Sequence, residues 1–193
     1  LEDLEITEAV LGRRHRETAV TLHALGKVAQ AAGDYPTARR YFLEDLEITE
    51  AVLGRRHRET AVTLHALGKV AQAAGDYPTA RRYYEEALAI KDDVLGRRHR
   101  ETAVTLHALG KVAQAAGDYP TARRYFLEDL EITEAVLGRR HRETAVTLHA
   151  LGKVAQAAGD YPTARRYFLE DLEITEAVLG RRHRETAVTL HAL

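Results

Sequence analysis

One segment, LHALGKVAQAAGDYPTARRYF, recurs every 42 residues along the chain, starting at Leu22, Leu64, Leu106 and Leu148. Outside residues 84–93 the period is unbroken, and within that window YEEALAIKDD replaces FLEDLEITEA. A fixed period of roughly 20 to 50 residues is typical of architectures in which each repeat packs mainly on its neighbours. The repeat therefore predicts a solenoid, and this constraint outweighs any expectation based on chain length.

Each repeat has the pattern of two helices joined by a tight turn. In the first half, apolar or small residues have helical spacing, at Leu22, Leu25, Gly26 and Ala29. Gly33 follows the end of this helix, and Pro36 occupies the favoured first position of the next one. In the second half a similar stripe runs through Ala38, Phe42, Asp45, Thr49 and Val52. The pattern predicts a helical hairpin in every repeat.

We expect first helices at about 17–32, 59–74, 101–116 and 143–158, and second helices at about 36–53, 78–95, 120–137 and 162–179. The predicted fold class is all-α, a right-handed solenoid of antiparallel helical hairpins. One solenoid domain spans residues 1–193, with a partial repeat at 1–10, hairpin repeats at about 11–53, 54–95, 96–137 and 138–179, and a partial repeat at 180–193.

Two residues in the stripes are unusual for helical cores. Gly26 lies mid-helix, where glycine costs about 1 kcal/mol relative to alanine, so we expect close helix packing there. Asp45 lies in an apolar stripe, either partly buried with Thr63 or an arginine of the next repeat as partner, or at the wet edge. Because Ala87 occupies the equivalent site, we expect Asp45→Ala to be neutral or mildly stabilising.

Composition and motif spacing argue against enzymatic chemistry. The chain has no cysteine, its formal net charge is −1, and its ten histidines have no metal-ligand spacing. There is no Ser/His/Asp arrangement, phosphate-binding loop or apolar run that could cross a bilayer. The RRHR connectors are expected to pair with neighbouring carboxylates, for example through Arg55, Arg56 and Arg58. We expect no enzyme activity, no cofactor or metal, and no nucleic-acid or membrane binding.

The repeat resembles the tetratricopeptide repeat, whose signature is W-x2-L-G-x2-Y, then A-x3-F, then P. The matching residues are Leu25, Gly26, Ala38 and Phe42. Leu22 and Ala29 stand at the Trp and Tyr positions, and Glu50 replaces the closing proline. The longer period and the Leu53-Gly54…His57 connector are similar to the subclass of kinesin light chains and nephrocystin-type proteins.

This resemblance implies a non-enzymatic scaffold that binds a protein or peptide along its concave face, through the first helix of each pair. The implied groove residues are His23, Lys27, Gln30, His65, Lys69, Gln72, His107, Lys111, Gln114, His149, Lys153 and Gln156. Val20, Ala24 and Ala31 would lie beside them. A row of lysines and histidines would favour acidic partners.

Two alternatives remain open. The chain begins and ends in mid-helix, so it is expected to be part of something longer, and its ends could stack head to tail into fibres. The residues of that contact would be Leu4, Ile6, Val10, Val188, Leu190 and Leu193. The chain could instead be the sensor segment of a larger bacterial signalling protein, which an upstream GxxxxGK[ST] would support. No signal peptide is visible, which favours a cytoplasmic location.

Overall fold

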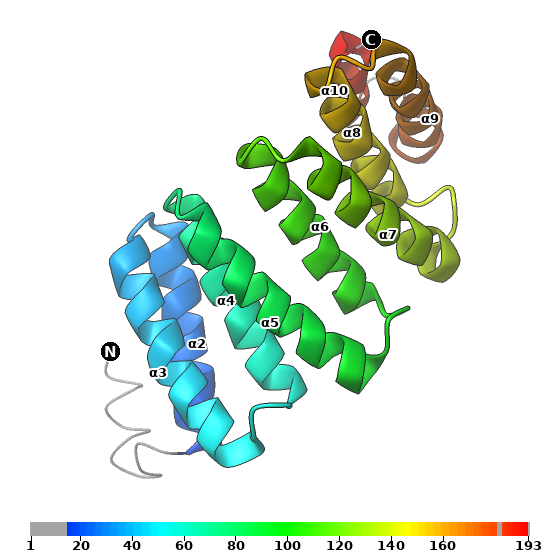
Figure 1. The fold of residues 1–193 in the computed structure, drawn as a ribbon. Helices are drawn as coiled ribbons and strands as arrows, with labels where there is room; N and C mark the ends of the chain where they lie inside the picture. The colour runs from blue at the N-terminus through cyan, green and yellow to red at the C-terminus, as the bar shows by residue number, and fades with distance from the viewer. Residues whose placement is uncertain (1–14, 181–182, 193) are drawn as a thin grey trace. The chain divides into compact units, whose positions relative to one another are not determined.

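A computed structural model describes residues 15–180 and 183–192 of the chain (Figure 1). These residues form helices joined by short turns and contain no strand. The helices are α2 (Arg16–Ala31), α3 (Tyr35–Leu53), α4 (Arg58–Ala73), α5 (Tyr77–Leu95), α6 (Arg100–Ala115), α7 (Tyr119–Leu137), α8 (Arg142–Ala157), α9 (Tyr161–Leu179) and α10 (Arg184–Ala192). The predicted helical hairpins are confirmed, with boundaries within about one residue of those expected from the sequence.

The residue before each helix caps it with its own side chain. His57 precedes α4, and its Nδ1 accepts a hydrogen bond of 3.1 Å from the backbone N–H of Glu59. Asp76 precedes α5, and its carboxylate accepts one of 3.1 Å from the backbone N–H of Thr79. Hydrogen bonding from Thr79 lowers the pKa of Asp76 below its usual value, because it stabilises the ionised carboxylate. The connector histidine is therefore a structural residue, which repeats at His15, His99, His141 and His183.

Glycine ends each helix where the backbone must turn sharply. Gly75, between α4 and α5, has a φ of 81°, and Gly96, after α5, has a φ of 86°. Residues with a side chain rarely adopt such angles. The N–H of Asp76 also donates to the carbonyl of Ala71 at 2.9 Å, which closes the turn of the hairpin. These glycines recur every 21 residues, one after each helix, so two of them fall in each 42-residue repeat.

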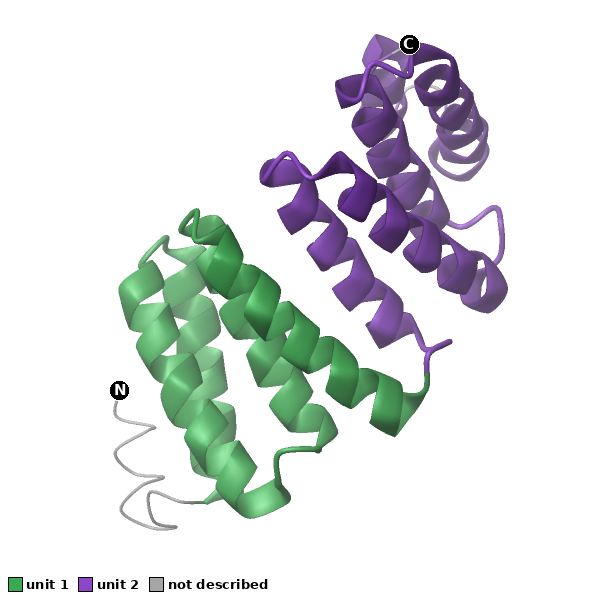
Figure 2. Cartoon of the chain, in the orientation of Figure 1, with its two compact units in different colours: residues 1–96 green, residues 97–193 purple. Residues whose placement is uncertain are grey.

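The chain divides into two compact units, Leu1–Gly96 and Arg97–Leu193 (Figure 2). The division lies one residue after the boundary expected between the second and third hairpin repeats. Among the described residues, the first unit contains α2 to α5 and the second contains α6 to α10. Within each unit the two helices of a hairpin pack on each other, and the second helix also packs on the next first helix, as α3 does on α4 and α7 on α8. One solenoid running through residues 1–193 remains a prediction.

The core of each unit is built from the same positions of successive repeats. In the first unit it includes Phe42 from α3 together with Ala61, Leu64 and Leu67 from α4. In the second unit the equivalent cluster is Phe126, Ala145, Leu148 and Leu151. The second predicted stripe is buried from Ala38 to Thr49, but its last member, Val52, is 45% exposed. The stripe therefore ends one turn earlier than the spacing predicted.

The mid-helix glycine of each first helix lies against the aromatic ring of its own hairpin. A Cβ atom placed on Gly110 would approach Cε1 of Phe126 to 2.6 Å, and one on Gly68 would approach Cδ1 of Tyr84 to 2.7 Å. Both rings are fully buried, so they have little room to move. The expectation that this glycine exists for close packing is confirmed. Without it the two helices of a hairpin could not approach so closely.

We predict that Gly110→Ala destabilises the protein, although alanine is the better helix former by about 1 kcal/mol. The added methyl group would collide with the buried ring of Phe126, and such overpacking costs about 1 to 3 kcal/mol. Urea unfolding followed by circular dichroism would show a lower midpoint. The loss should shrink in a Phe126→Leu background, because leucine leaves more room. A higher midpoint for Gly110→Ala would contradict this packing account.

Candidate binding surface

The first helices of the hairpins expose a valine at the same position in every repeat. We call the surface that these helices form within each unit the first-helix face. Its valines are between 38% and 59% exposed, at Val20, Val62, Val104, Val146 and Val188. An exposed valine is common by itself, but the same exposed position on successive first helices gives each unit a row of apolar side chains on one face. This row is part of the surface that the family resemblance implies as a groove.

A buried carboxylate lies beneath the first-helix face and joins three helices. Asp45 on α3 is 3% exposed, and its Oδ2 lies 2.9 Å from Nδ1 of His23 on α2. Thr63 on the next first helix, α4, donates its hydroxyl to the same oxygen at 2.8 Å. Thr49, one turn along α3, donates to Oδ1 at 2.8 Å. Three hydrogen bonds compensate the carboxylate for its loss of water.

The second unit contains two further copies of this carboxylate cluster. Asp129 contacts His107 at 2.9 Å, Thr133 at 3.0 Å and Thr147 at 2.7 Å. Asp171 contacts its own partners at equally short distances, which are 2.9 Å to His149, 2.8 Å to Thr175 and 2.7 Å to Thr189. The same three-helix bridge therefore occurs wherever the repeat sequence is FLEDLEITEA and the following helix is described.

The sequence identified Thr63 as one possible partner of Asp45, and the structure confirms it. The other possibilities, an arginine partner or a position at the solvent-exposed edge of the stripe, are wrong, because Asp45 is 3% exposed. Its partners within the described residues are His23, Thr49 and Thr63. The sequence did not predict the contact between Asp45 and His23. The two residues are 22 positions apart on different helices, and a stripe within one helix carries no signal for such a contact.

Each carboxylate cluster lines a pocket, and in the second unit these pockets are small, mainly apolar sockets. The α6–α7–α8 socket has a volume of about 180 Å³ and is lined by Ala103, Val104, His107, Asp129, Thr133, Glu143, Val146 and Thr147. The α8–α9–α10 socket has a volume of about 160 Å³ and is lined by Ala145, Val146, His149, Asp171, Thr175, Glu185, Val188 and Thr189. In the first unit the equivalent residues line a larger cavity of about 920 Å³. Lys27 and Ala24 also line that cavity.

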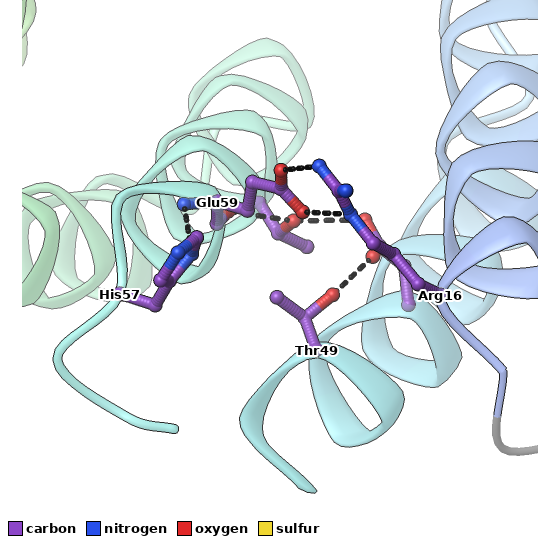
Figure 3. A network of polar contacts seen from close by, with 6 residues as sticks. Arg16, Thr49, His57 and Glu59 are labelled. Carbon is purple, nitrogen blue, oxygen red and sulfur yellow. Dashed lines mark hydrogen bonds and ion pairs between the residues drawn. The ribbon is translucent and has the colours of Figure 1, made fainter. Parts of the chain in front are cut away.

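The connector arginines are engaged with carboxylates of neighbouring repeats. Arg16 on α2 binds Glu59 on α4, as Figure 3 shows, with His57 and Thr49 nearby. Arg100 and Glu143 form the same pair between α6 and α8. Such exposed pairs contribute about 0 to 1 kcal/mol each. The sequence predicted that connector arginines pair with neighbouring carboxylates, and the structure confirms this for Arg55, which pairs with Glu50, and for Arg56, which pairs with Asp93.

The predicted groove residues fall into three classes. The lysines are exposed and hold no ion pair within the described part of the chain, at Lys27, Lys69, Lys111 and Lys153. The histidines are half-buried, with each ring against the aromatic ring of its hairpin, at His23, His65, His107 and His149. Of the glutamines Gln30, Gln72, Gln114 and Gln156, only Gln156 is exposed and the other three are half-buried. Gln72 accepts a hydrogen bond from the buried Tyr84 hydroxyl at 3.0 Å.

Burial raises the pKa of the Tyr84 hydroxyl, so this group remains a neutral donor to Gln72.

No glutamine lines the sockets of the second unit. Of the predicted groove residues, the histidines His23, His107 and His149 therefore line the same pockets as the exposed valines. In the first unit Lys27 does so as well.

The residues proposed for end-to-end contact are only partly described. Leu4, Ile6, Val10 and Leu193 lie outside the described residues. Val188 and Leu190 on α10 are 49% and 52% exposed, and Val188 also lines the α8–α9–α10 socket. Head-to-tail association remains a prediction. Among the described residues, no helix is long and apolar enough to cross a membrane, and no three His, Cys, Asp or Glu side chains are grouped as metal ligands.

The chain matches a known family over most of its length. The family model described as the tetratricopeptide repeat matches residues 17–93, 72–128 and 101–170. A comparison with curated proteins found no match.

Several solved structures share the fold. A Podosopora anserina protein, described as kinesin light chain nearly identical TPR-like repeats, is 22% identical, with a TM-score of 0.80 over 93% of this chain and 85% of that one. BtubC (BKLC) from P. vanneervenii is 20% identical, with a TM-score of 0.78 over 86% of this chain and 66% of that one. The apo form of RapI is 18% identical, with a TM-score of 0.78 over 90% of this chain and 62% of that one. At these identities the likeness shows the fold alone.

The cluster reverses the expectation that removing the stripe aspartate is harmless. We predict that Asp129→Ala lowers stability by about 2 to 4 kcal/mol, because it leaves the buried hydroxyl of Thr133 and Nδ1 of the half-buried His107 without their acceptor. Asp129→Asn should cost less, since the amide oxygen can still accept. Urea unfolding of both variants would measure the difference. Equal stability of Asp129→Ala and the unmodified chain would contradict a cohesive role for the carboxylate.

Proposed function

Because the chain belongs to the tetratricopeptide repeat family, we propose that it is a non-enzymatic interaction scaffold that binds a peptide or protein segment along its first-helix face. The single observation that carries this proposal is the combination of an exposed valine and an exposed lysine on each complete first helix, in the same register every time. A surface that repeats both features is suited to a ligand that runs across several helices.

The apolar part of this surface favours binding over simple solvation. The valines project beside sockets whose polar atoms are hydrogen-bonded to one another, as in the cluster around Asp129. A ligand that covers these valines releases water from apolar surface, which contributes about 25 cal/mol per Å². It does so without breaking the hydrogen bonds of the buried carboxylate and its threonine partners.

The charged part of the surface favours an acidic ligand. The connector arginines are paired with carboxylates of neighbouring repeats, as in Arg100 with Glu143 and Arg142 with Glu185. Lys111 and Lys153 are exposed and hold no ion pair within the described part of the chain. Unpaired cations on a face with an apolar strip attract carboxylates of a partner and direct their approach.

We predict that acidic peptides lose binding when the lysines of the second unit are reversed in charge. Peptides of twelve random residues would be selected on the full chain by phage display, and binding would be measured by fluorescence anisotropy. We expect Lys111→Glu/Lys153→Glu to weaken the selected peptides by about 10-fold or more at low salt, and less at high salt, because screening reduces the contribution of exposed charges.

A matched control is Arg123→Glu/Arg165→Glu, which makes the same charge change at equivalent positions of the second helices α7 and α9. This control should retain binding. Equal loss in both double variants would indicate a response to net charge alone, and no loss in either would place the binding surface elsewhere. Both results would contradict the proposal.

A further inference from the structure

The two sockets of the second unit are identical in sequence and share a wall. Each position that lines the α6–α7–α8 socket recurs 42 residues later in the α8–α9–α10 socket. Val146 on α8 lines both of them. A ligand that fits one socket therefore meets the same chemistry again in the next socket, with a single valine between them.

Each socket presents mainly carbon to a ligand. The carboxylate of Asp129 and the hydroxyls of Thr133 and Thr147 are hydrogen-bonded to each other. Glu143 is held by Arg100. With these groups occupied, the surface that remains is formed by methyl groups such as those of Val104, together with one edge of the imidazole. An apolar side chain is the chemistry that such a socket accommodates.

The imidazole supplies one directional group per socket. Nδ1 of His107 lies 2.9 Å from Asp129, which fixes the orientation of the ring. The structure shows no hydrogen bond to its Nε2 within the described residues, and the side chain of His107 is 23% exposed. His149 is arranged in the same way. An extended peptide has free backbone N–H and C=O groups that can bond to such a nitrogen, whereas a helix has used its own internally.

The distance between the sockets sets the spacing of a ligand. Packed helices lie about 8 to 10 Å apart, and α6 and α8 contact each other while both pack on α7, so equivalent points of the two sockets lie on the order of 10 Å apart. An extended strand advances about 3.3 Å per residue, so positions four apart lie on the same side of the strand about 13 Å apart. In a polyproline II segment, positions three apart lie on the same side about 9 Å apart.

Building on the proposed function, we propose that the ligand is an extended, periodic peptide that places an apolar side chain in each socket, with anchors three or four residues apart. Acidic residues between the anchors would lie near Lys111 and Lys153, which follow the socket histidines by one helical turn. Because the sockets are identical, the best partner repeats its own sequence. Each added anchor binds at a high effective concentration, so affinity rises steeply with the number of anchors in register.

The test uses the full chain and labelled peptides made of Ser and Glu with leucine anchors. One peptide has a single leucine, and others have two leucines adjacent, three apart, four apart or seven apart. Anisotropy titrations should show that leucines three or four apart bind about 10-fold or more tightly than one leucine. Adjacent leucines, at the same composition, should gain no more than about twofold, since only one of them can enter a socket at a time.

Two substitutions test whether the affinity added by the second leucine arises in the sockets. Val146→Glu places a charge in the wall of both sockets and should remove the advantage of the second leucine. Val136→Glu on α7 is the matched control, because Val136 is 46% exposed, against 44% for Val146, and lines neither socket. It should leave the advantage intact. Circular dichroism of both variants would verify that helicity is unchanged.

The outcomes separate this inference from the proposed function. Affinity that does not depend on anchor spacing but still falls in Lys111→Glu/Lys153→Glu would overturn the periodic ligand and leave the scaffold proposal standing. Binding that depends on neither the lysines nor the spacing would overturn both. Tightest binding at seven residues, with helix formation in the peptide, would replace the extended ligand by a helical one. Failure of the peptides with leucines three or four apart to bind would also overturn the inference.

Discussion

A carboxylate shared by three helices links the fold of this protein to its candidate binding surface. In each copy the aspartate comes from a second helix, the histidine from the first helix of the same hairpin and a threonine from the next first helix, as in Asp45 with His23 and Thr63. One side chain thereby fixes the hairpin, its neighbour and the ring that lines the socket. A buried carboxylate is expensive to desolvate, so the hydrogen bonds from His23, Thr63 and Thr49 are needed to offset that cost.

The variant repeat shows that these positions change together. In the second helix α5, Ala87 replaces the aspartate, and Lys91 replaces the threonine that would donate to it from one turn away. The aromatic ring that packs against Gly68 is retained, but it belongs to Tyr84 where the other repeats have phenylalanine. The hydroxyl of Tyr84 donates a hydrogen bond to Gln72. The aspartate and its helix-internal donor are thus lost as a pair. This is expected if the threonine is needed mainly to satisfy the buried carboxylate.

Most of the fold could be predicted from the sequence because its signals are local. The glycine after each first helix, the proline at the start of each second helix and the spacing of Leu22 and Leu25 are all read within one hairpin. The close approach of the two helices at Gly26 was also predictable, since a mid-helix glycine destabilises a helix unless close packing offsets its cost. The histidine contact, the sockets and the capping by His57 were not, because they depend on which side chains of different helices or turns face one another. The pairing of the arginines was predicted from charge balance alone.

The central claim is that a peptide ligand covers the first-helix face. Methyl NMR of valine-labelled protein measures this directly, with signals assigned by single substitutions, during titration with a peptide selected on the full chain. The account predicts that shifts concentrate at exposed valines of the first helices, such as Val104 and Val146, and are absent at equally exposed valines of the second helices, such as Val94 and Val136. Shifts confined to the second-helix valines would contradict it.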